Sequence, residues 1–353
     1  MFKLAENIHA QPKSLALALQ HQLGEGAAAM TQAAVLVRSG KRIVITGMGA
    51  SLFASIPLQY ALCAQGLDAF AIEAGELLHH LDNAWHDAVV LMVSRSGESV
   101  EIAKLLERMK GRVPIIGVTN EPGSTLAQSA DVCLLIGSLQ DQIVAIQTYT
   151  GTLLTLHLLG SVVAGRLDAA TQELEQVLPA FATLVEANMN SVMQWDSFLT
   201  PYASLYLLAR GPSLASAYEG ALLFHEVAKS PAVTMTVASF RHGPVEVVDH
   251  KFRGFVFTPQ GATRDLNLAL AADLVQFGGQ VRVVGSATSN PQNLKWCDMP
   301  SVSTSLVALF EIVPLQAASF RLAELRGIEP GSFRFAPQVA VDEASFSQQA
   351  ASR

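Results

Sequence analysis

Three serines surround one glycine in the segment Ser94-Arg95-Ser96-Gly97-Glu98-Ser99, called here the serine loop. It follows an apolar run of strand character at 88–93 and leads into a helical pattern. Hydroxyls and backbone amides at the start of a helix can surround a phosphate group. Helix capping is the ordinary alternative, but capping needs one hydroxyl and this loop offers three. The pattern predicts a phosphate site formed by Ser94, Arg95, Ser96, Gly97 and Ser99.

A second loop of this kind follows the β-branched run 42–46 and reads Gly47-Met48-Gly49-Ala50-Ser51. In a doubly wound sheet, ligands bind beyond the carboxyl ends of the strands, where loops expose backbone amides. We therefore expect Gly49, Ala50 and Ser51 to belong to the same kind of site. Neither GxGxxG nor GxxxxGKS occurs, so the sequence indicates no nucleotide cofactor.

The second half of the chain carries residues suited to acid–base chemistry. Glu219 and Glu226 are seven residues apart on an expected helix and so share a face, and His242 follows in Phe240-Arg241-His242-Gly243-Pro244. Taken singly, Glu226 suits an exposed helix position and His242 a structural histidine. Together, a carboxylate and an imidazole are what ring opening and enolisation of a sugar require. We expect Glu226 and His242 to be catalytic.

Strand-like runs that alternate with helical segments must position these residues. Continuous β-branched runs between helices are typical of a parallel sheet covered on both faces. Three of the strand–loop units recur after 162 to 168 residues, which indicates an internal duplication. The strand-like runs lie at 42–46, 88–93, 113–118, 132–136, 205–209, 255–257 and 281–284.

The predicted fold is therefore two duplicated, doubly wound, flavodoxin-like parallel-sheet α/β domains. Residues 1–180 would form an N-terminal helix and the first domain, which holds the serine loop. Residues 181–353 would form the second domain, which holds Glu226 and His242, and a C-terminal tail. The length of 353 residues suits two domains better than one.

Composition narrows the function classes. The chain is 50% hydrophobic and only 15% charged, against about 25% for an average protein, which favours a buried subunit interface and a homodimer. A net charge of −7 argues against nucleic-acid binding. The three cysteines, Cys63, Cys133 and Cys297, are far apart, so we expect reduced buried thiols, without a disulfide framework or a zinc site.

We also expect a cytoplasmic protein without a membrane segment. The first residues lack the apolar core of a signal peptide. The most apolar stretch, 148–165, is interrupted by Thr, His and Ser and is typical of a buried helix.

Four motifs in this order resemble those of the sugar isomerase (SIS) domain family, and most of all the tandem pair in the isomerase half of glucosamine-6-phosphate synthase. The resemblance runs from about Arg42 to Val341. It implies a sugar-phosphate substrate, Glu226 as the isomerising base, and His242 as the ring-opening group that reaches the site of a neighbouring subunit. The matching motifs are S-x-S-G-E-[ST] at 94–99, G-[TS]-S at 49–51, E-G-A-L-x-x-x-E at 219–226 and [KR]-H-G-P at 241–244.

The sequence departs from the synthase pattern at its lysines. Leu223 stands where that family has a lysine before the base, and Gln338 stands where its Schiff-base lysine would be. The segment 143–150 also lacks the serine and lysine of the family's V-A-S-T-K motif. An amide cannot act as the nucleophilic amine, which disfavours Schiff-base synthase chemistry. The chain shows neither a glutaminase domain nor an N-terminal cysteine, so we do not expect glutamine-fed ammonia.

These observations predict an enzyme without a cofactor that acts at C1–C2 of a 6-phosphorylated ketose or amino sugar. The reaction would be an isomerisation, a deamination or a deglycation, and related deglycases are similar in using a glutamate and a histidine. The alternative is a phosphosugar-binding sensor that keeps the serine loop and has lost the chemistry. No helix-turn-helix region accompanies the motifs, which favours the enzyme.

Overall fold

The structure is a computed structural model and describes residues 2–287, 294–335 and 343. Two units are distinguished: unit A comprises Ala10–Glu175 and Phe333–Arg353, and unit B comprises Met1–His9 and Gln176–Ser332. Helices α1 (Lys3–Leu23) and α8 (Leu167–Ser191) each contribute residues to both units. Each unit has its own five-stranded parallel sheet, so each is described by itself.

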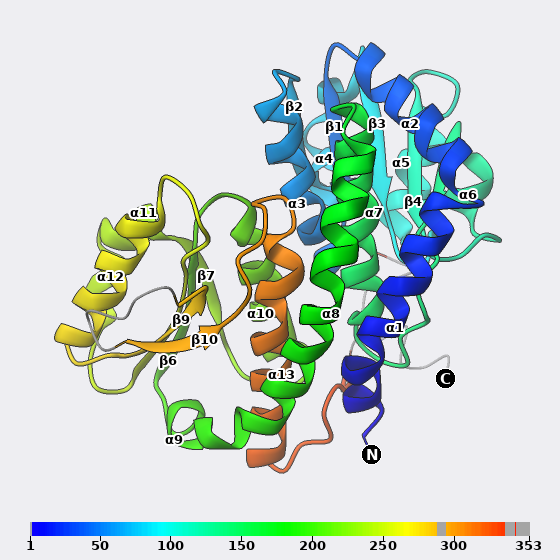
Figure 1. Ribbon diagram of the computed structural model, residues 1–353. Helices are drawn as coiled ribbons and strands as arrows, with labels where there is room; N and C mark the ends of the chain where they lie inside the picture. The colour runs from blue at the N-terminus through cyan, green and yellow to red at the C-terminus, as the bar shows by residue number, and fades with distance from the viewer. Residues whose placement is uncertain (1, 288–293, 336–342, 344–353) are drawn as a thin grey trace. The chain divides into compact units, whose positions relative to one another are not determined.

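Sheet A, in unit A, has the strand order β2-β1-β3-β4-β5, which is the flavodoxin-like order (Figure 1). Gly47 on β1 pairs with Val93 on β3, so these neighbouring strands end at the same level. Every residue of β1, β3 and β4 is buried, whereas the two edge strands are partly exposed. The strands are β1 (Ile43–Gly47), β2 (Ala69–Glu73), β3 (Val89–Val93), β4 (Ile115–Thr119) and β5 (Val132–Leu135).

Helices cover both faces of sheet A. On α5 the buried residues are Ile102, Leu105, Leu106 and Met109, a helical spacing that gives one apolar stripe against the sheet. Helices α4 and α6 share that face with α5, and α2, α3 and α7 pack on the other. These helices are α2 (Ala27–Ser39), α3 (Gly49–Ala64), α4 (Ala74–His79), η1 (Asp82–Trp85), α5 (Val100–Met109), α6 (Thr125–Ser129) and α7 (Gln147–Val163).

Helix α7 corresponds to the apolar stretch 148–165, and nearly all of its side chains are buried, as expected. Among the helices that the structure describes, none combines the length and the apolar character that a membrane span requires. The cysteines are free thiols, but only Cys297 is buried: Cys63 is exposed and Cys133 is intermediate. The expectation of three buried thiols was therefore wrong for Cys63, which lies near the exposed C-terminal end of α3.

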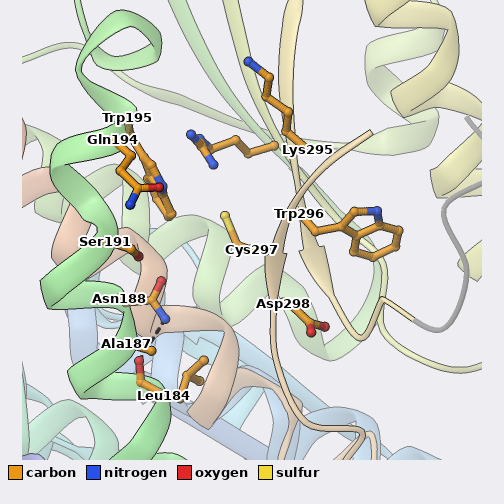
Figure 2. Close-up of a pocket in the computed structure, with 11 residues that line it drawn as sticks. Leu184, Ala187, Asn188, Ser191, Gln194, Trp195, Lys295, Trp296, Cys297 and Asp298 are labelled. Atoms are coloured by element: carbon orange, nitrogen blue, oxygen red, sulfur yellow. Dashed lines mark hydrogen bonds between the residues drawn. The ribbon is translucent and has the colours of Figure 1, made fainter. Parts of the chain in front are cut away.

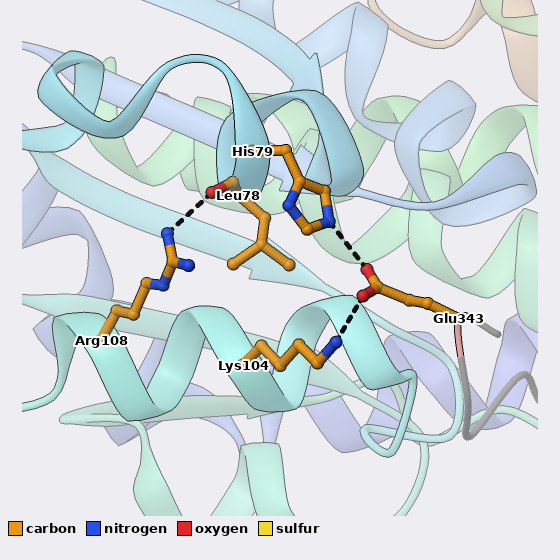
Figure 3. A network of polar contacts seen from close by, with 5 residues as sticks. All are labelled: Leu78, His79, Lys104, Arg108 and Glu343. Carbon is orange, nitrogen blue, oxygen red and sulfur yellow. Dashed lines mark hydrogen bonds and ion pairs between the residues drawn. The ribbon is translucent and has the colours of Figure 1, made fainter.

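A polar network fixes α5 against its neighbours in unit A (Figure 3). Arg108 on α5 donates to the carbonyl oxygen of Leu78 on α4 at 2.7 Å. The carboxylate of Glu343 accepts a hydrogen bond from Lys104 on α5 and lies 3.1 Å from Nε2 of His79 on α4. The bond from Lys104 holds the pKa of Glu343 below its usual range, with His79 adding to the effect. The network thus joins α4 to α5, the helix that follows the serine loop.

Sheet B, in unit B, repeats the topology, because its order β7-β6-β8-β9-β10 is the same 2-1-3-4-5 arrangement. The predicted pair of duplicated parallel-sheet domains is therefore confirmed. The predicted boundary at residue 180 stays a prediction. The strands are β6 (Ser204–Ala209), β7 (Val233–Thr236), β8 (Phe252–Phe257), β9 (Gln280–Gly285) and β10 (Lys295–Asp298).

Helices also cover both faces of sheet B, and consecutive residues of β6 show which helix lies where. Leu207 faces Gly220 of α10, which also meets Leu315 of α13. Leu208 faces the opposite way and packs in one cluster with residues of α11 and α12. Thus α10 and α13 cover one face, and α11 and α12 the other (Figure 1). The helices are η2 (Val192–Trp195), α9 (Asp196–Leu199), η3 (Gly211–Ser213), α10 (Leu214–Glu226), α11 (Val237–Arg241), η4 (Pro244–Val247), α12 (Arg264–Gln276) and α13 (Val307–Leu325).

A buried carboxyl group joins α13 to the loop after β6. Glu311 on α13 has no exposed surface, and its Oε1 accepts a hydrogen bond from the Ser213 hydroxyl at 2.8 Å. Burial raises the pKa of Glu311 to about 8, so the carboxyl is largely protonated at neutral pH. A neutral carboxyl avoids the large cost of an unpaired buried charge.

This pKa predicts how stability depends on pH. Between the ordinary value of 4.5 and about 8, the unfolded chain releases the Glu311 proton while the folded chain keeps it, so the free energy of unfolding falls as pH rises through this window. Glu311→Gln has no proton to release, so its stability relative to wild type should rise from pH 4.5 to 8. Urea unfolding across this range measures the difference. The exposed variant Glu107→Gln is the control, and parallel curves for wild type and Glu311→Gln would contradict the assignment.

Candidate functional site

The two predicted ligand loops of unit A follow the carboxyl ends of two neighbouring strands. The loop 49–51 follows β1 and the serine loop follows β3, and these strands end together at the pair Gly47 and Val93. The connection after β1 passes through α3 on one face of sheet A, and that after β3 passes through α5 on the other. This divergence is the topological switch point, where open α/β sheets bind their ligands.

Gly97 gives the serine loop its shape. Its φ of +66° lies in the left-handed region that favours glycine. A Cβ atom at this position would lie 2.2 Å from the Ser124 hydroxyl oxygen, so no larger residue fits without movement. The Gly97 amide donates to Oγ of Ser94 at 3.1 Å, which closes the turn directly after β3.

The serine hydroxyls do not cap helix α5. Ser99 is the residue at the N-cap, yet its side chain accepts no hydrogen bond from the helix. Its hydroxyl instead lies 3.3 Å from the hydroxyl of Ser94. The Ser96 hydroxyl accepts a hydrogen bond from the amide of Glu98, which precedes the helix, at 3.3 Å. Capping therefore does not account for the three serines, and the positive end of α5 lies next to three hydroxyl groups.

Contacts with the loop after β4 hold the serine loop in place. The Arg95 carbonyl oxygen accepts hydrogen bonds from the Thr119 hydroxyl at 3.0 Å and the Asn120 amide at 3.1 Å. The Glu98 carboxylate accepts from the amide of Thr125 at 2.5 Å and from its hydroxyl at 2.9 Å. Glu98 thus supports the loop, a role that the sequence did not assign because its partner is 27 residues away.

The loop 49–51 forms the first turn of α3. Gly49 begins the helix with a φ of +48°, and the residue before it, Met48, supplies no side-chain cap. Ala50 and Ser51 are half-buried in the same turn. Gly47 lies so close to β3 that a Cβ atom there would approach the Val93 carbonyl oxygen to 2.7 Å. The glycines thus permit two close-packed strand ends with a helix N-terminus beside them.

Glu226 is the last residue of α10 and lies half-buried at the end where the chain turns toward β7. The neighbouring His225 ring accepts the amide hydrogen of Ala232 at 3.1 Å, which places this end beside the start of β7. The ammonium group of Lys229 donates to the carbonyl oxygen of Glu226. Lys229 has a left-handed φ of +52° in the turn after the helix and contacts the backbone of the predicted base. Sequence reasoning overlooked Lys229.

His242 follows α11 and is exposed. Helix α11 starts at the carboxyl end of β7 and packs on the face of sheet B opposite to α10. Glu226, on α10 at the amino end of β7, and His242 therefore lie on opposite faces of one sheet. The structure does not bring these two predicted catalytic residues together within unit B. Their joint action in one site stays a prediction.

Comparisons with known proteins agree on one family. The SIS domain family profile matches residues 36–161 and 198–326. Glutamine–fructose-6-phosphate aminotransferase (isomerizing) of Pyrococcus horikoshii is 24% identical over 335 residues, which is 93% of this chain and 55% of that protein. The chain thus spans about half the length of the curated relatives it matches.

Solved structures share the fold. The C-terminal domain of glucosamine-fructose-6-phosphate aminotransferase from Francisella tularensis superposes with a TM-score of 0.81 at 20% identity, covering 93% of this chain and 96% of that one. Glucosamine-6-phosphate deaminase from Thermotoga maritima gives a TM-score of 0.76 at 19% identity, with coverage of 96% and 99%. The two-sheet architecture is therefore common to proteins that are named for different activities.

The geometry of the serine loop predicts the effect of adding a methyl group. Gly97→Ala combines a left-handed φ with a clash at Ser124, whereas Gly111→Ala has a φ of +73° and open space. Gly111→Ala should lower the free energy of unfolding by about 1–2 kcal/mol, the cost of the conformation alone. Gly97→Ala should cost about 1–3 kcal/mol more, because the clash adds to it. Equal losses in urea unfolding would show that Ser124 does not constrain the loop.

Proposed function

Because the chain belongs to the SIS domain family, we propose that it is an enzyme acting at C1–C2 of a 6-phosphorylated ketose or amino sugar. The reaction is an isomerisation, a deamination or a deglycation. The observation that carries the proposal is the serine loop, whose hydroxyls surround a helix N-terminus without capping it. Anions bind at such positions through amide and hydroxyl donors.

In this proposal the serine loop binds the phosphate of the substrate. Hydroxyls of Ser94, Ser96 and Ser99 and the amides of the first turn of α5 are the donors. Gly49, Ala50 and Ser51, at the neighbouring strand end, contact the sugar. The net charge of the chain is −7, so an anion is held by these local donors and not by the overall field. Glu98 acts as a support because Thr125 already occupies its carboxylate.

The chemistry is proton transfer. The Glu226 carboxylate removes the proton from the carbon next to the carbonyl group, the C–H electrons form the C1–C2 double bond, and the carbonyl oxygen takes up a proton to give an enediol or enolamine. Glu226 then returns the proton to the other carbon, while the hydroxyl group on the first carbon loses its proton and becomes the new carbonyl group, which completes an isomerisation. The His242 imidazole moves a proton between the anomeric hydroxyl and the ring oxygen, which opens the cyclic sugar.

The residues that replace the synthase lysines favour these reactions over glutamine-dependent synthesis. Leu223 is a core residue of α10 and is 1% exposed, so an apolar side chain suits this position. At the start of α7 the Asp141 carboxylate accepts hydrogen bonds from the amides of Gln147 at 2.8 Å and Thr148 at 2.9 Å. The N-terminus of α7 belongs to the segment 143–150, which lacks the serine and lysine of the synthase motif, and it already binds a carboxylate of this chain. Gln338 lies outside the described residues.

We propose further that the enzyme is a homodimer in which each site takes Glu226 from one chain and His242 from the other. The helices that lead to these two residues pack on opposite faces of sheet B. Glu226 lies near the amino end of β7, whereas His242 follows a helix that starts at the carboxyl end of β7, so both the end and the face of the sheet separate them. A two-fold symmetric pair of chains can present both residues to each of two sites.

Removal of the base tests the enzymatic reading. Glu226→Gln keeps the side-chain shape, so it should reduce turnover by about 10²–10⁴ while substrate still binds. Ser96→Ala should instead weaken binding of fructose 6-phosphate or glucosamine 6-phosphate about tenfold, because it loses a hydrogen bond to a charged group. Turnover and hydrogen exchange at C1 and C2 in deuterated water are the measurements, with the exposed variant Glu329→Gln as the control.

Two results would contradict the proposal in different ways. Full turnover by Glu226→Gln would place the base elsewhere, with Glu219 as the next candidate. Binding of sugar phosphates to wild type without turnover or hydrogen exchange would identify a phosphosugar sensor.

Mixing two inactive variants tests the shared site. Glu226→Gln and His242→Ala homodimers should each be impaired, but random subunit exchange gives hybrid dimers in which one of two sites is intact. An equal mixture should therefore recover about a quarter of wild-type turnover. Light scattering establishes the dimer, and tagged subunits establish exchange. Dimers that exchange without recovering activity would show that the site uses both residues from one chain or does not use both.

A further inference from the structure

Unit B contains a cavity of about 450 Å³ between the C-terminal part of α8 with η2 and the edge of sheet B. Figure 2 shows Asn188, Ser191, Gln194 and Trp195 on the helical wall, opposite the strand that carries Lys295 and Cys297. The volume lies within the range of small-molecule sites. The cavity is built from unit B alone and does not include the serine loop, which belongs to unit A.

Arg282 of β9 lines this cavity and is 8% exposed. Its guanidinium group lies 3.9 Å from the ring centroid of Trp195 and 5.2 Å from that of Phe198. The two rings pack on the guanidinium, and the Cys297 side chain hydrogen-bonds to it. Among the described residues, Nε of Arg282 has no hydrogen-bond acceptor. A buried donor without an acceptor is costly, and for a charged group the cost is greater.

A second buried arginine on the same face shows what a satisfied guanidinium looks like here. Arg253 of β8 is 4% exposed and donates to four backbone carbonyl oxygens within 3.0 Å. These acceptors belong to Phe198, Pro201, His250 and Phe252. The fold is thus able to satisfy an arginine beneath sheet B. Arg282, on the neighbouring strand, hydrogen-bonds to the Cys297 side chain and otherwise borders a cavity.

Lys295 adds a second positive charge to the cavity. It pairs in register with Arg282 across β10 and β9, so both side chains lie on the same face of the sheet. Like charges that pair directly in a sheet repel each other unless an anion lies between them. Of the described residues that line the cavity, only Asp298 is acidic, and its carboxylate accepts the Ala287 amide at 2.8 Å. In Figure 2, Asp298 and Trp296 point away from the helical wall.

We propose that this cavity is a second ligand site, which binds a small organic anion bearing a carboxylate or a phosphate group. Arg282 and Lys295 bind the charged group, since a guanidinium edge and an ammonium group are the donors that such anions prefer. The hydroxyl of Ser191 and the amides of Asn188 and Gln194 contact the polar remainder. The cavity exceeds what an inorganic ion would fill, so the ligand is an organic molecule.

Titration with citrate and with glycerol 3-phosphate tests the site and distinguishes the two kinds of anion. Binding is measured by calorimetry and by tryptophan fluorescence, which reports on Trp195, on the full chain carrying Ser96→Ala to weaken the serine loop. We expect one of the two probes to bind with one equivalent per chain. Lys295→Gln should weaken that binding about tenfold, and Arg282→Lys, which loses the planar fork, should weaken it at least as much.

The matched control is Lys251→Gln, an exposed lysine of the same unit that lies outside the cavity lining. It should bind the probe as the parent does. The proposal is overturned if neither probe binds at millimolar concentration, if Lys295→Gln binds as tightly as the parent, or if Lys251→Gln weakens binding equally. Lys295 is exposed, so its variant should fold even if Arg282→Lys does not.

Discussion

Parallel strands can be joined only by crossover connections, and this constraint determines which strand ends are left open to a ligand. In unit A the crossovers from β1 and β3 leave toward opposite faces of the sheet, through α3 and α5. The ends of two adjacent strands therefore lie uncovered, and their amides need partners. The Ser94 hydroxyl satisfies the Gly97 amide, and Glu98 ties the loop to Thr125. What remains is a set of hydroxyls around a helix N-terminus.

The same topology in unit B has a different outcome. At the switch point of sheet B, Ser213 donates to Glu311, and Asn267 accepts from Arg210 and donates to the Phe257 carbonyl oxygen. Arg264 donates to the carbonyl oxygens after β8 and β9. The second copy thus satisfies its strand ends with its own side chains. Its reactive groups lie elsewhere, at the end of α10 and after α11, which explains how a duplicated fold carries two unlike halves of one proposed function.

Continuous apolar sequence predicted the central strands because a strand buried on both faces is apolar at most of its positions. This holds for β1, β3, β4 and β8, whose residues are all buried. The strands β2, β7 and β10 escaped sequence analysis, and each lies at an edge with exposed or half-exposed residues. An edge strand has one neighbour and less burial, so its sequence carries less of the signal that identified the others, although the apolar run of the edge strand β5 was recognised.

The sequence by itself determined the two sheets, the family, and the serine loop with Gly97, because these depend on local backbone preference and on uninterrupted burial. Only the tertiary structure decided that the Ser99 side chain does not cap α5 and that Glu226 and His242 lie on opposite faces of sheet B. It also decided that Arg282 and Lys295 are neighbours in the register of β9 and β10. Each of these depends on which side of a strand or helix a residue faces. That choice is set by the register of strand pairing and by packing between segments far apart in the chain, which residue type and spacing do not encode.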